Sequence, residues 1–471
     1  MAESPSEPAI ERVGKRRPQW RRGRLVWTAG AVVLIAASGA YGFLMHAHEL
    51  FPYSILKHGY HALLPDAPHA MPKARPAAAG HVSAAPADVQ RLANLPYLQG
   101  YRPATAGGAI RVNDRSRTAK GLNLFASGHA PVATLMDMDG KVVKTWAADA
   151  AKAFPGAALE HNEHARFLRR VHLLPDGSIL ALFDELGLVH LDPDSRILWS
   201  FRERVHHDFF VGEKGKIWVV SRELRLVPEL RREKPVWEDF IVELSPEGKL
   251  LRRLSVIECF RRSGYAPLLA NIGPQHDVLH TNSIRVLDGS LAGLSPFFQR
   301  GNVLISMKNL STIAVVDPNA GVVVWALSGQ WYAQHSARLL PSGHLLLFDN
   351  LGLMRPASRV LEIDPLTQKV VWRFGGRPGE ELLSETSGWV DRLPNGNTLI
   401  TESNFGRVIE VTHDNQIVWE FVNPNRAGKN GDKVATIYEM ERITRDLPLI
   451  KLPTDGSAAG SEAAASRSTP R

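Results

Sequence analysis

The feature that most restricts the fold of this chain is a short hairpin that occurs six times. Each copy contains a turn rich in Pro, Asp, Asn or Gly, followed by an apolar strand that often ends in Trp. The copies occupy residues 135–146, 190–201, 243–254, 315–327, 362–374 and 410–421. A unit that recurs about every 50 residues is typical of solenoids, propellers and other repeat arrays.

A second hairpin lies between successive copies, as in "RVHLLPDGSILALFD" and "HSARLLPSGHLLLFDN". Each of these hairpins has an apolar strand, a turn that contains Gly, and another apolar strand. Two hairpins give four antiparallel strands per unit, which is the composition of a β-propeller blade. No helical periodicity competes with this interpretation over the repeat region.

The two ends of the repeat region indicate how the ring closes. Only the strand "LNLFAS" (122–127) precedes the first copy, whereas a single strand within residues 434–444 follows the last. If that C-terminal strand is the innermost strand of the first blade, the ring closes and leaves no exposed edge. We therefore predict an all-β fold: a six-bladed β-propeller over residues 120–445, closed by a C-terminal strand.

The N-terminal part of the sequence predicts a membrane anchor. Residues 1–24 form a basic tail, and the uncharged residues 25–45, "LVWTAGAVVLIAASGAYGFLM", are long enough for a transmembrane helix. The positive-inside rule places the tail in the cytoplasm and exports the rest. We expect a single-pass signal anchor in the inner (plasma) membrane, with the propeller in the periplasm or otherwise outside the cytoplasm. A signal peptide cleaved near Ala37–Ala40 is the alternative.

Two further segments lie outside the repeats. Residues 46–119, rich in Ala, Pro and Gly, are predicted to be a linker, and residues 446–471 a disordered tail. The linker histidines are too irregularly spaced to predict a metal site. They are His46, His48, His58, His61, His69 and His81.

Charge and cysteine content exclude some classes of function. The net charge is +8, but half of this excess lies in residues 1–24, so it does not indicate nucleic-acid binding by the propeller. Cys259 is the one cysteine, which excludes an internal disulfide. It has no CxxC partner, and we expect it to be a small buried hydrophobic residue. No HExxH motif or phosphate-binding Gly-rich loop occurs, so neither a metal nor a cofactor is predicted.

Histidines recur at the start of the first strand of the central hairpins. His335 lies eight residues before Gly343, His207 lies eight before Gly215, and His280 lies nine before Gly289. Arg169 and Gly388 take this position in two other blades. The first strand of a blade lines the central channel, so we expect three imidazoles to converge at one mouth of it. The alternative is a repeated structural contact, in which each histidine bonds the backbone of a neighbouring blade.

Polar residues also cluster where the second strand of each central hairpin ends. They are Asp184-Glu185, Arg222-Glu223, Lys308-Asn309, Asp349-Asn350 and Glu402-Ser403-Asn404. The cations Lys308 and Arg222 would suit an anionic substrate if they lie beside the imidazoles. Asn282, two residues after His280, is predicted to lie on the same face of its strand and to bind the same ligand.

Several of these segments resemble the bacterial arylsulfotransferase family, the aryl-sulfate sulfotransferases that work without a nucleotide sulfate donor. They are "ATLMDMDGKVVKTW", "HHDF" (206–209), "HTNS" (280–283), "QHSARLLPSGHLLLFDN" (334–350) and "VVWRFGG" (370–376). The resemblance implies that His335 attacks the sulfuryl group and becomes a sulfohistidine. It also places His207, His280 and Asn282 in the site. The family's active-site arginine falls at Lys308, in "SMKN", and a lysine lacks the fork that grips two oxygens.

The resemblance therefore predicts a ping-pong transfer of a sulfuryl group from an aryl sulfate to a phenol. Imidazole is a competent nucleophile, and its adduct divides one displacement into two. A second histidine would donate and later accept the phenolic proton, while Lys308 and Asn282 hold the sulfuryl oxygens. Two alternatives stay open at this point: a non-catalytic propeller that binds a ligand or protein at its channel face, and a quinone-cofactor dehydrogenase propeller. The sequence does not indicate an oligomeric state.

Overall fold

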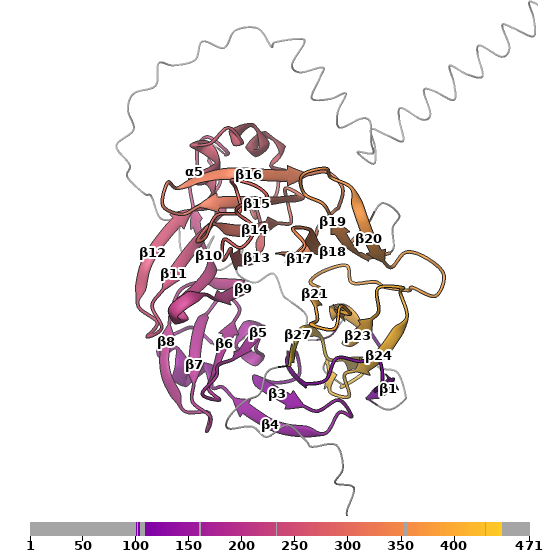
Figure 1. Ribbon diagram of the computed structural model, residues 1–471. Coiled ribbons are helices and arrows are strands. Elements are labelled where there is room, and N and C mark those ends of the chain that lie inside the picture. The colour runs from indigo at the N-terminus through magenta and orange to yellow at the C-terminus, as the bar shows by residue number, and fades with distance from the viewer. Residues whose placement is uncertain are drawn as a thin grey trace, which may run out of the picture. The chain divides into compact units, whose positions relative to one another are not determined.

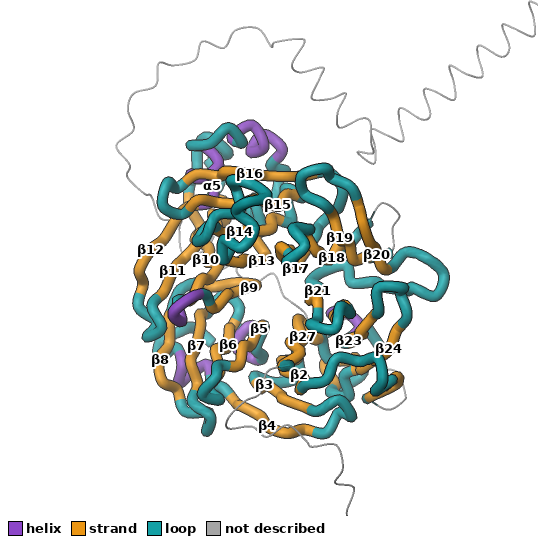
Figure 2. Tube along the Cα trace, viewed as in Figure 1, coloured by secondary structure: helices purple, strands orange, loops and turns teal. Residues whose placement is uncertain are grey.

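The computed structural model describes residues 100, 102–103, 109–159, 162–231, 233–352, 357–428 and 430–444. Within these residues six antiparallel sheets are arranged around a central channel, as Figure 1 shows. This arrangement confirms the predicted six-bladed β-propeller. Strands and loops make up nearly all of the ring, and the few helices lie in the connections (Figure 2).

The first three blades are given from the inner to the outer strand. Blade 1 is β27 (Ile437–Ile443), β2 (Leu122–Ser127), β3 (Val132–Met136) and β4 (Val142–Ala147). Blade 2 is β5 (Arg170–Leu173), β6 (Ile179–Phe183), β7 (Gly187–Leu191) and β8 (Ile197–Phe201). Blade 3 is β9 (Val205–Val211), β10 (Ile217–Arg225), β11 (Val236–Leu244) and β12 (Leu250–Ser255).

The other three blades follow the same order. Blade 4 is β13 (Thr281–Val286), β14 (Val303–Met307), β15 (Thr312–Asp317) and β16 (Val322–Ser328). Blade 5 is β17 (His335–Leu339), β18 (Leu345–Asp349), β19 (Arg359–Ile363) and β20 (Val370–Phe374). Blade 6 is β21 (Trp389–Arg392), β22 (Thr398–Glu402), β23 (Arg407–Val411) and β24 (Ile417–Val422).

The C-terminal strand closes the ring as the sequence predicts. β27 is the innermost strand of blade 1 and pairs antiparallel with β2, with Leu122 opposite Ile443 and Phe125 opposite Met440. Strands from both ends of the domain therefore share one sheet, and blade 1 cannot form without residues from beyond the last blade.

A strand that the sequence analysis did not foresee extends blade 6. β1 (Ile110–Asn113) pairs antiparallel with β24 at the outer edge, placing Asn113 opposite Trp419. β1 lies within residues 46–119, the predicted linker, so ordered structure begins before residue 120. The predicted transmembrane segment, residues 25–45, lies outside the described residues. Among those that are described, no helix is long and apolar enough to cross a membrane.

Short helices and one small ribbon occupy the connections. They are α4 (Ala150–Ala153), η1 (Glu163–Arg166), η2 (Glu213–Gly215), α5 (Val256–Arg261), η3 (Ala266–Asn271), η4 (Ser403–Phe405) and the ribbon β25 (Arg426–Ala427) with β26 (Lys433–Val434). Ser255 caps α5, because its hydroxyl accepts from the Glu258 N–H at 3.0 Å. Cys259 on this helix is a free, buried thiol, as predicted.

The apolar core lies between neighbouring blades. Leu182 and Leu188 of blade 2 pack in one cluster with Phe209, Val219 and Val242 of blade 3. Similar clusters lie between blades 4 and 5 and between blades 5 and 6. Burial of these faces fixes each blade against the next, and the inner strands therefore reach the channel from set positions.

Candidate active site

Hydrogen bonds join the inner strands of neighbouring blades in one recurring pattern. A side chain on one inner strand accepts from a backbone N–H on the next strand. The pairs are Glu439 Oε1 with Val171 (3.2 Å), Asp208 Oδ2 with Ile284 (3.0 Å), Ser283 Oγ with Ala337 (3.2 Å) and Ser336 Oγ with Val390 (3.1 Å). This pattern defines equivalent positions around the ring, independent of the turn lengths.

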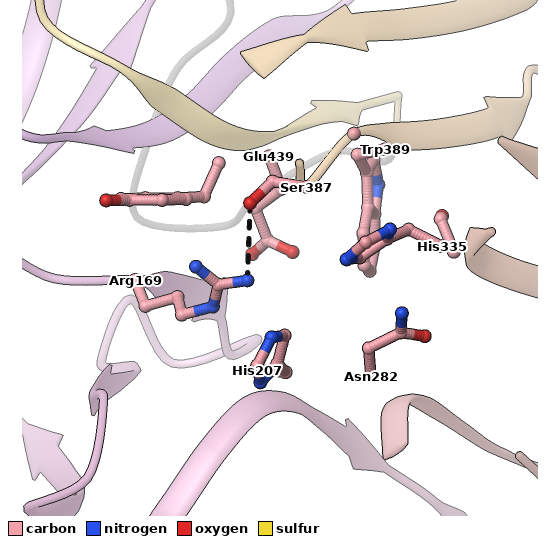
Figure 3. A pocket seen from close by; sticks show the side chains of 10 residues that line it. Arg169, His207, Asn282, His335, Ser387, Trp389 and Glu439 are labelled. Carbon is pink, nitrogen blue, oxygen red and sulfur yellow. Dashed lines mark hydrogen bonds between the residues drawn. The ribbon is translucent and has the colours of Figure 1, made fainter. Parts of the chain in front are cut away.

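In each blade the residue just before the accepting side chain, or before its equivalent in blades 2 and 6, lies at a common centre. From blade 1 to blade 6 these residues are Tyr438, Arg169, His207, Asn282, His335 and Gly388. All six line one pocket that is partly open to solvent, together with Ser336, Ser387, Trp389 and Glu439. Figure 3 shows the labelled side chains around this pocket. Each blade thus contributes the residue at its equivalent position to the pocket.

The hairpin alignment places four of these residues correctly and one histidine incorrectly. Arg169, His207, His335 and Gly388 occupy the equivalent position, as the alignment predicts. In blade 4 this position belongs to Asn282, whereas His280 lies two residues earlier, just outside β13. The cause is the long turn between β13 and β14, which makes the turn glycine an unreliable reference point.

Irregular backbone at the start of the inner strands aims these side chains. His207 and His280 have φ angles of 60° and 55°, which are uncommon for residues other than Gly. The ladder between β13 and β14 is irregular between Thr281 and Ser283, and that between β17 and β18 between His335 and Arg338. Such bulges re-aim side chains and often lie beside active sites.

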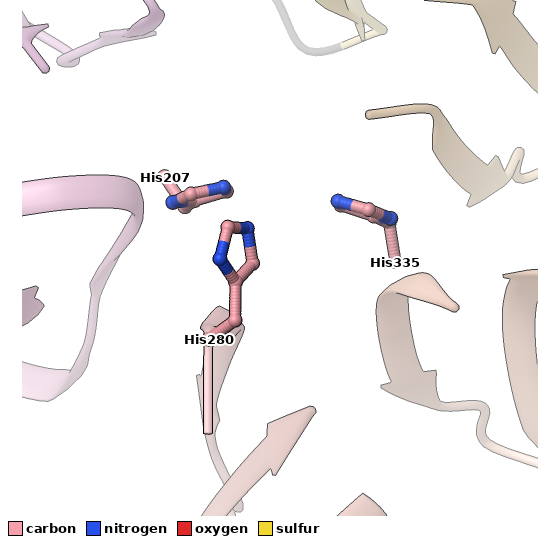
Figure 4. A group of neighbouring side chains, drawn as sticks. All are labelled: His207, His280 and His335. Atoms are coloured by element: carbon pink, nitrogen blue, oxygen red, sulfur yellow. The ribbon is translucent and has the colours of Figure 1, made fainter. Parts of the chain in front are cut away.

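The three histidines predicted from the sequence lie close together. The ring centroids of His207 and His280 are 4.6 Å apart, and those of His207 and His335 are 6.3 Å apart. They come from three consecutive blades and converge in Figure 4. One nitrogen of each ring lies within 4.8 Å of a nitrogen of the other two.

All three imidazoles use Nδ1 for a contact away from their common centre. His207 Nδ1 is 2.8 Å from His206 Nδ1, His280 Nδ1 is 2.6 Å from Asp277 Oδ2, and His335 Nδ1 is 2.7 Å from Asn350 Oδ1. In His335 the other nitrogen, Nε2, is therefore the one available to a ligand. His207 and His335 line the pocket, whereas His280 is not among the described residues that line it. This division of roles between the two nitrogens is how proteins set the tautomer of a histidine.

The tautomer of His335 is fixed by its surroundings. Both partners of Nδ1 are acceptors, namely Asn350 Oδ1 and the Ala333 carbonyl at 3.1 Å, so Nδ1 carries the proton. The orientation of the Asn350 amide is fixed too, because its Nδ2 donates to the carbonyls of Ser384 (2.8 Å) and Ser387. Neutral His335 therefore has a lone pair on Nε2.

His335 is neutral under ordinary conditions. Burial is the main reason that its pKa lies well below the usual value, and the nearby Lys308 cation lowers the pKa further. The hydrogen bond with Asn350 acts in the opposite direction but does not offset these effects. A buried neutral imidazole with a free Nε2 is the form that a nucleophile requires.

His280 belongs to a chain of charged groups that includes Arg222 and Glu185, which the sequence analysis named, and Asp277, which it did not. Its partner Asp277 also contacts Arg222 Nη1 at 3.0 Å, and Arg222 Nε lies 2.7 Å from Glu185 Oε1. Burial opposes ionisation of Asp277, but His280 and Arg222 outweigh it and hold the Asp277 pKa below its usual value. Burial lowers the pKa of His280, and the Asp277 carboxylate opposes that shift. This pairing suits a residue that exchanges a proton.

His207 is the innermost member of a different chain. His206 Nε2 lies 3.4 Å from Asp239 Oδ1, and its Nδ1 faces His207. With the His206 proton directed at this carboxylate, His206 Nδ1 accepts from His207 Nδ1–H. Burial, reinforced by Arg169, lowers the pKa of His207 well below its usual value. His207 is thus also neutral, with Nε2 towards the pocket.

The pocket has two neighbouring cations. Arg169 lines it and is 5% exposed. Lys308 follows β14, and its backbone N–H donates to the His280 carbonyl at 3.1 Å, but its side chain is not among those lining the pocket. Burial lowers the pKa of Lys308; Asp277 opposes this shift and Arg169 adds to it. Lys308 therefore acts on the site through its charge in this structure.

Asn282 lines the pocket, and its neighbour Gln334 has a structural role. Asn282 Nδ2 donates to the Gln334 carbonyl at 2.8 Å, which ties blade 4 to the start of β17. The Gln334 side chain is buried and donates to Ser306 Oγ at 3.0 Å and to the carbonyls of Met307 and Thr312. In the Gln-His pair, the glutamine therefore anchors the strand on which His335 lies.

The three histidines also form the one group in the described residues whose donor atoms are close enough to suggest a metal site. Zinc–imidazole bonds of about 2.0 Å require nitrogens roughly 3.4 Å apart in a tetrahedral site. The present spread reaches 4.8 Å, and the cations Arg169 and Lys308 oppose a second positive charge. The donor set fits a metal poorly, and the absence of a metal from the reaction stays a prediction.

Comparisons with known proteins were made for sequence and for fold. The sequence model of the family described as arylsulfotransferase (ASST) matches residues 170–424, more than half of the chain. No curated protein sequence matches the chain. Similar solved structures include a protein of unknown function from Bacteroides caccae, with 14% identity over 69% of this chain and 99% of that one and a TM-score of 0.47. A streptogramin B lyase has 12% identity over 74% and 97% of the two chains and a TM-score of 0.40. These structural similarities are too remote to carry an argument about chemistry.

Proposed function

Because the chain belongs to the arylsulfotransferase family, we propose that it transfers a sulfuryl group from an aryl sulfate to a phenol by way of His335. Family membership supports sulfotransferase activity in general terms. The observation that supports this particular route is the fixed tautomer of His335, whose Nδ1–H is held by Asn350 and whose Nε2 is free at the pocket.

In the first half-reaction His335 Nε2 attacks the sulfur atom of the aryl sulfate. The new N–S bond forms as the bond from sulfur to the aryl oxygen breaks, and the electrons of that bond leave with the oxygen. Nδ1 keeps its proton, so the sulfated ring is cationic, and its bond to Asn350 becomes charge-assisted and stronger. The reaction centre carries negative oxygens, and catalysis consists mainly of positioning and charge stabilisation.

A second histidine carries the phenolic proton. In this proposal His280 starts as an imidazolium paired with the Asp277 carboxylate, and its Nε2–H gives a proton to the leaving oxygen, which leaves His280 neutral. The phenol departs and an acceptor phenol takes its place. His280 recovers a proton from the acceptor as its oxygen attacks the sulfur and the N–S bond breaks. The sum of both halves leaves His335 and His280 unchanged, and no metal or cofactor enters either step.

Asn282 keeps the sulfuryl-binding role that the sequence suggested, as part of the proposal, whereas Lys308 contributes through its charge alone. Asn282 lies at the pocket beside His335. Lys308 adds positive potential at His335. His207 lines the pocket, and in its neutral form with the proton on Nδ1 its Nε2 would accept a hydrogen bond from the hydroxyl of the acceptor phenol.

The test is a chemical trap combined with turnover. The protein is mixed with 4-nitrophenyl sulfate without an acceptor, quenched at alkaline pH and digested. Mass spectrometry should find one sulfuryl group on the peptide that contains His335. With phenol added, phenyl sulfate should form. A His335→Ala variant that turns over as fast as the wild type would refute the route through His335. Binding of aryl sulfates without transfer would instead favour the non-catalytic propeller.

We also propose that residues 25–45 anchor the protein in the inner membrane with the propeller outside the cytoplasm. The uncharged run and its basic N-terminal flank support this topology. Alkaline phosphatase fused after the propeller should be active in cells, and fractionation should find the intact chain in the membrane. An inactive fusion, or a chain shortened at Ala37–Ala40, would contradict the anchor.

A further inference from the structure

Blade 4 contributes no guanidinium to the pocket, although the family's active-site arginine corresponds to a position in this blade. In that place stands Lys308, a point charge without a planar fork, and its side chain does not line the pocket. An aryl sulfate has three terminal sulfuryl oxygens that share a negative charge. A paired, planar donor recognises such a group better than an ammonium does.

Arg169 is the one cationic side chain among the described residues that line the pocket, apart from the histidines. It precedes β5 and occupies the same ring position as His207 and His335. Figure 3 shows its guanidinium reaching into the pocket from the side opposite His335. A group bound to His335 Nε2 would therefore lie between the nucleophile and this guanidinium.

The surroundings of Arg169 hold its guanidinium in one orientation. The guanidinium carbon lies 4.6 Å from the centre of the Tyr438 ring, a cation–π contact that fixes the plane of the group. Nη2 is 3.5 Å from Ser387 Oγ, and Nε is 3.9 Å from Asp184 Oδ1. These contacts place the guanidinium at the pocket, where its N–H groups point towards a group bound at His335.

The charge of Arg169 extends over the whole site. It lowers the pKa of His207, His335 and Lys308, which means that its positive potential reaches each of these groups. Asp184 and Glu439 lie nearby, but Asp184 accepts from the His207 N–H, and Glu439 is held by Val171 and Arg170. Glu439 also lines the pocket; burial raises its pKa to about 7, and Arg170 pairs with it. The pocket therefore presents a guanidinium, neutral imidazoles and a carboxyl group whose charge Arg170 offsets, an arrangement suited to a monoanion.

We propose that Arg169 grips the sulfuryl oxygens of the aryl sulfate, so that in this chain the guanidinium comes from blade 2 rather than blade 4. This inference rests on the proposed function for the reaction, but the binding of the sulfuryl oxygens by Arg169 can be measured without turnover. Lys308 then contributes positive electrostatic potential, whereas Arg169 forms directed hydrogen bonds with the sulfuryl oxygens. The site recognises aryl monoesters or sulfonates with one negative charge and three terminal oxygens.

The experiment measures turnover and binding separately in Arg169→Ala, Arg169→Lys and Lys308→Arg. Turnover is release of 4-nitrophenol from 4-nitrophenyl sulfate, and binding is calorimetry with benzenesulfonate, which has no ester bond to cleave. Arg196→Ala is the matched control, because this arginine is on the surface, paired with Asp192 and Asp194. Thermal unfolding checks that each variant folds.

For Arg169→Ala we expect kcat/KM and benzenesulfonate affinity both to fall, by about 10- to 100-fold, the effect of removing a hydrogen bond between charged groups. Arg169→Lys should lose about tenfold, and guanidinium ion should partly restore Arg169→Ala. Lys308→Arg should restore part of the loss in Arg169→Lys, because it returns a guanidinium to the site from blade 4. Arg196→Ala should match the wild type.

The results separate the two proposals. If the wild type binds benzenesulfonate through Arg169 but cleaves no aryl sulfate, the proposed function is wrong and the inference on Arg169 stands. If the wild type is active and Arg169→Ala keeps its turnover and affinity within threefold, the inference on Arg169 is overturned. It is also overturned if the wild type binds no benzenesulfonate, or if Arg169→Ala loses activity only because it unfolds and the folded Arg169→Lys behaves as wild type.

Discussion

Replacement of Asn350 tests how the protein prepares its nucleophile. The Asn350→Ala change removes the acceptor of the His335 Nδ1–H bond, which is 2.7 Å long and buried. With neutral partners such a bond contributes about 1 kcal/mol, and with a charged partner about 1.5–3 kcal/mol. His335 is neutral before reaction and cationic once sulfated. The difference, roughly 1.4 kcal/mol, is lost from the transition state and corresponds to about tenfold in kcat.

The change also predicts a shift in pH dependence with a definite sign. The bond to Asn350 raises the His335 pKa against the lowering by burial and Lys308. Its removal lowers that pKa further, so the acid limb of the kcat profile moves to lower pH. In Asn350→Asp a carboxylate accepts the same bond, the pKa rises, and the limb moves to higher pH. Release of 4-nitrophenol in a single turnover, followed from about pH 4 to 9, measures both shifts.

A control separates positioning from folding. Asn350 also anchors the carbonyls of Ser384 and Ser387, so its loss destabilises the fold. Asn404 anchors Thr386 in the same segment through its Oδ1 and Nδ2, and the structure shows no contact with His335. Asn404→Ala should therefore lower the melting temperature while keeping the pH profile and kcat within about threefold. Equal pH profiles in Asn350→Ala, Asn350→Asp and the wild type would refute the role of Asn350.

Three further predictions concern other parts of the molecule. Burial lowers the pKa of Lys308 from its usual value of 10.5, so Lys308 should lose its charge at an alkaline pH that is still below 10.5. Single-turnover release of nitrophenol should fall as that charge is lost. Lys308→Arg should remove this limb, and its persistence would exclude Lys308 as the cause. Burial raises the pKa of the Cys259 thiol to about 11, so iodoacetamide at pH 8 should label it only after denaturation, as mass spectrometry can show. A chain that ends at residue 436 lacks β27 and exposes the edge of β2; circular dichroism and gel filtration should show an unfolded or aggregated product, and a stable monomer would contradict closure by β27.

The sequence predicted the parts of the fold that depend on local repetition. The turn-and-Trp hairpin set the number of blades, and the strand after the last copy indicated closure. β1 was missed because four residues, "IRVN", carry no recognisable period, and their order comes from pairing with β24. β1 forms because it pairs with β24, and the strand propensity of its own residues does not predict such a tertiary contact.

The positions that line the pocket were predictable from the repeat, but the hydrogen-bond partners of the histidines were not. Positions aligned on the turn glycine gave Arg169, His207, His335 and Gly388 their correct places, because their turns are of similar length. Asp277 and Asn350 as histidine partners were not predictable in this way. Asp277 lies in an irregular loop, and the contact between Asn350 and His335 arises from the packing of β17 against the end of β18. No periodic signal marks either pair.

The chemistry of this ring depends on which residue stands at one equivalent position in each blade. The side chain of the following residue accepts from a backbone N–H of the next inner strand and so fixes that position whichever residue occupies it, which lets the scaffold tolerate different residues there. Fold similarity alone is consequently uninformative about the reaction. The informative features are the residues that contact the Nδ1 atoms of the histidines. Asn350 contacts His335, and His206, which lies beside Asp239, contacts His207. They direct Nε2 of each ring into the pocket, and a site that merely filled the channel with histidines would not require these particular partners.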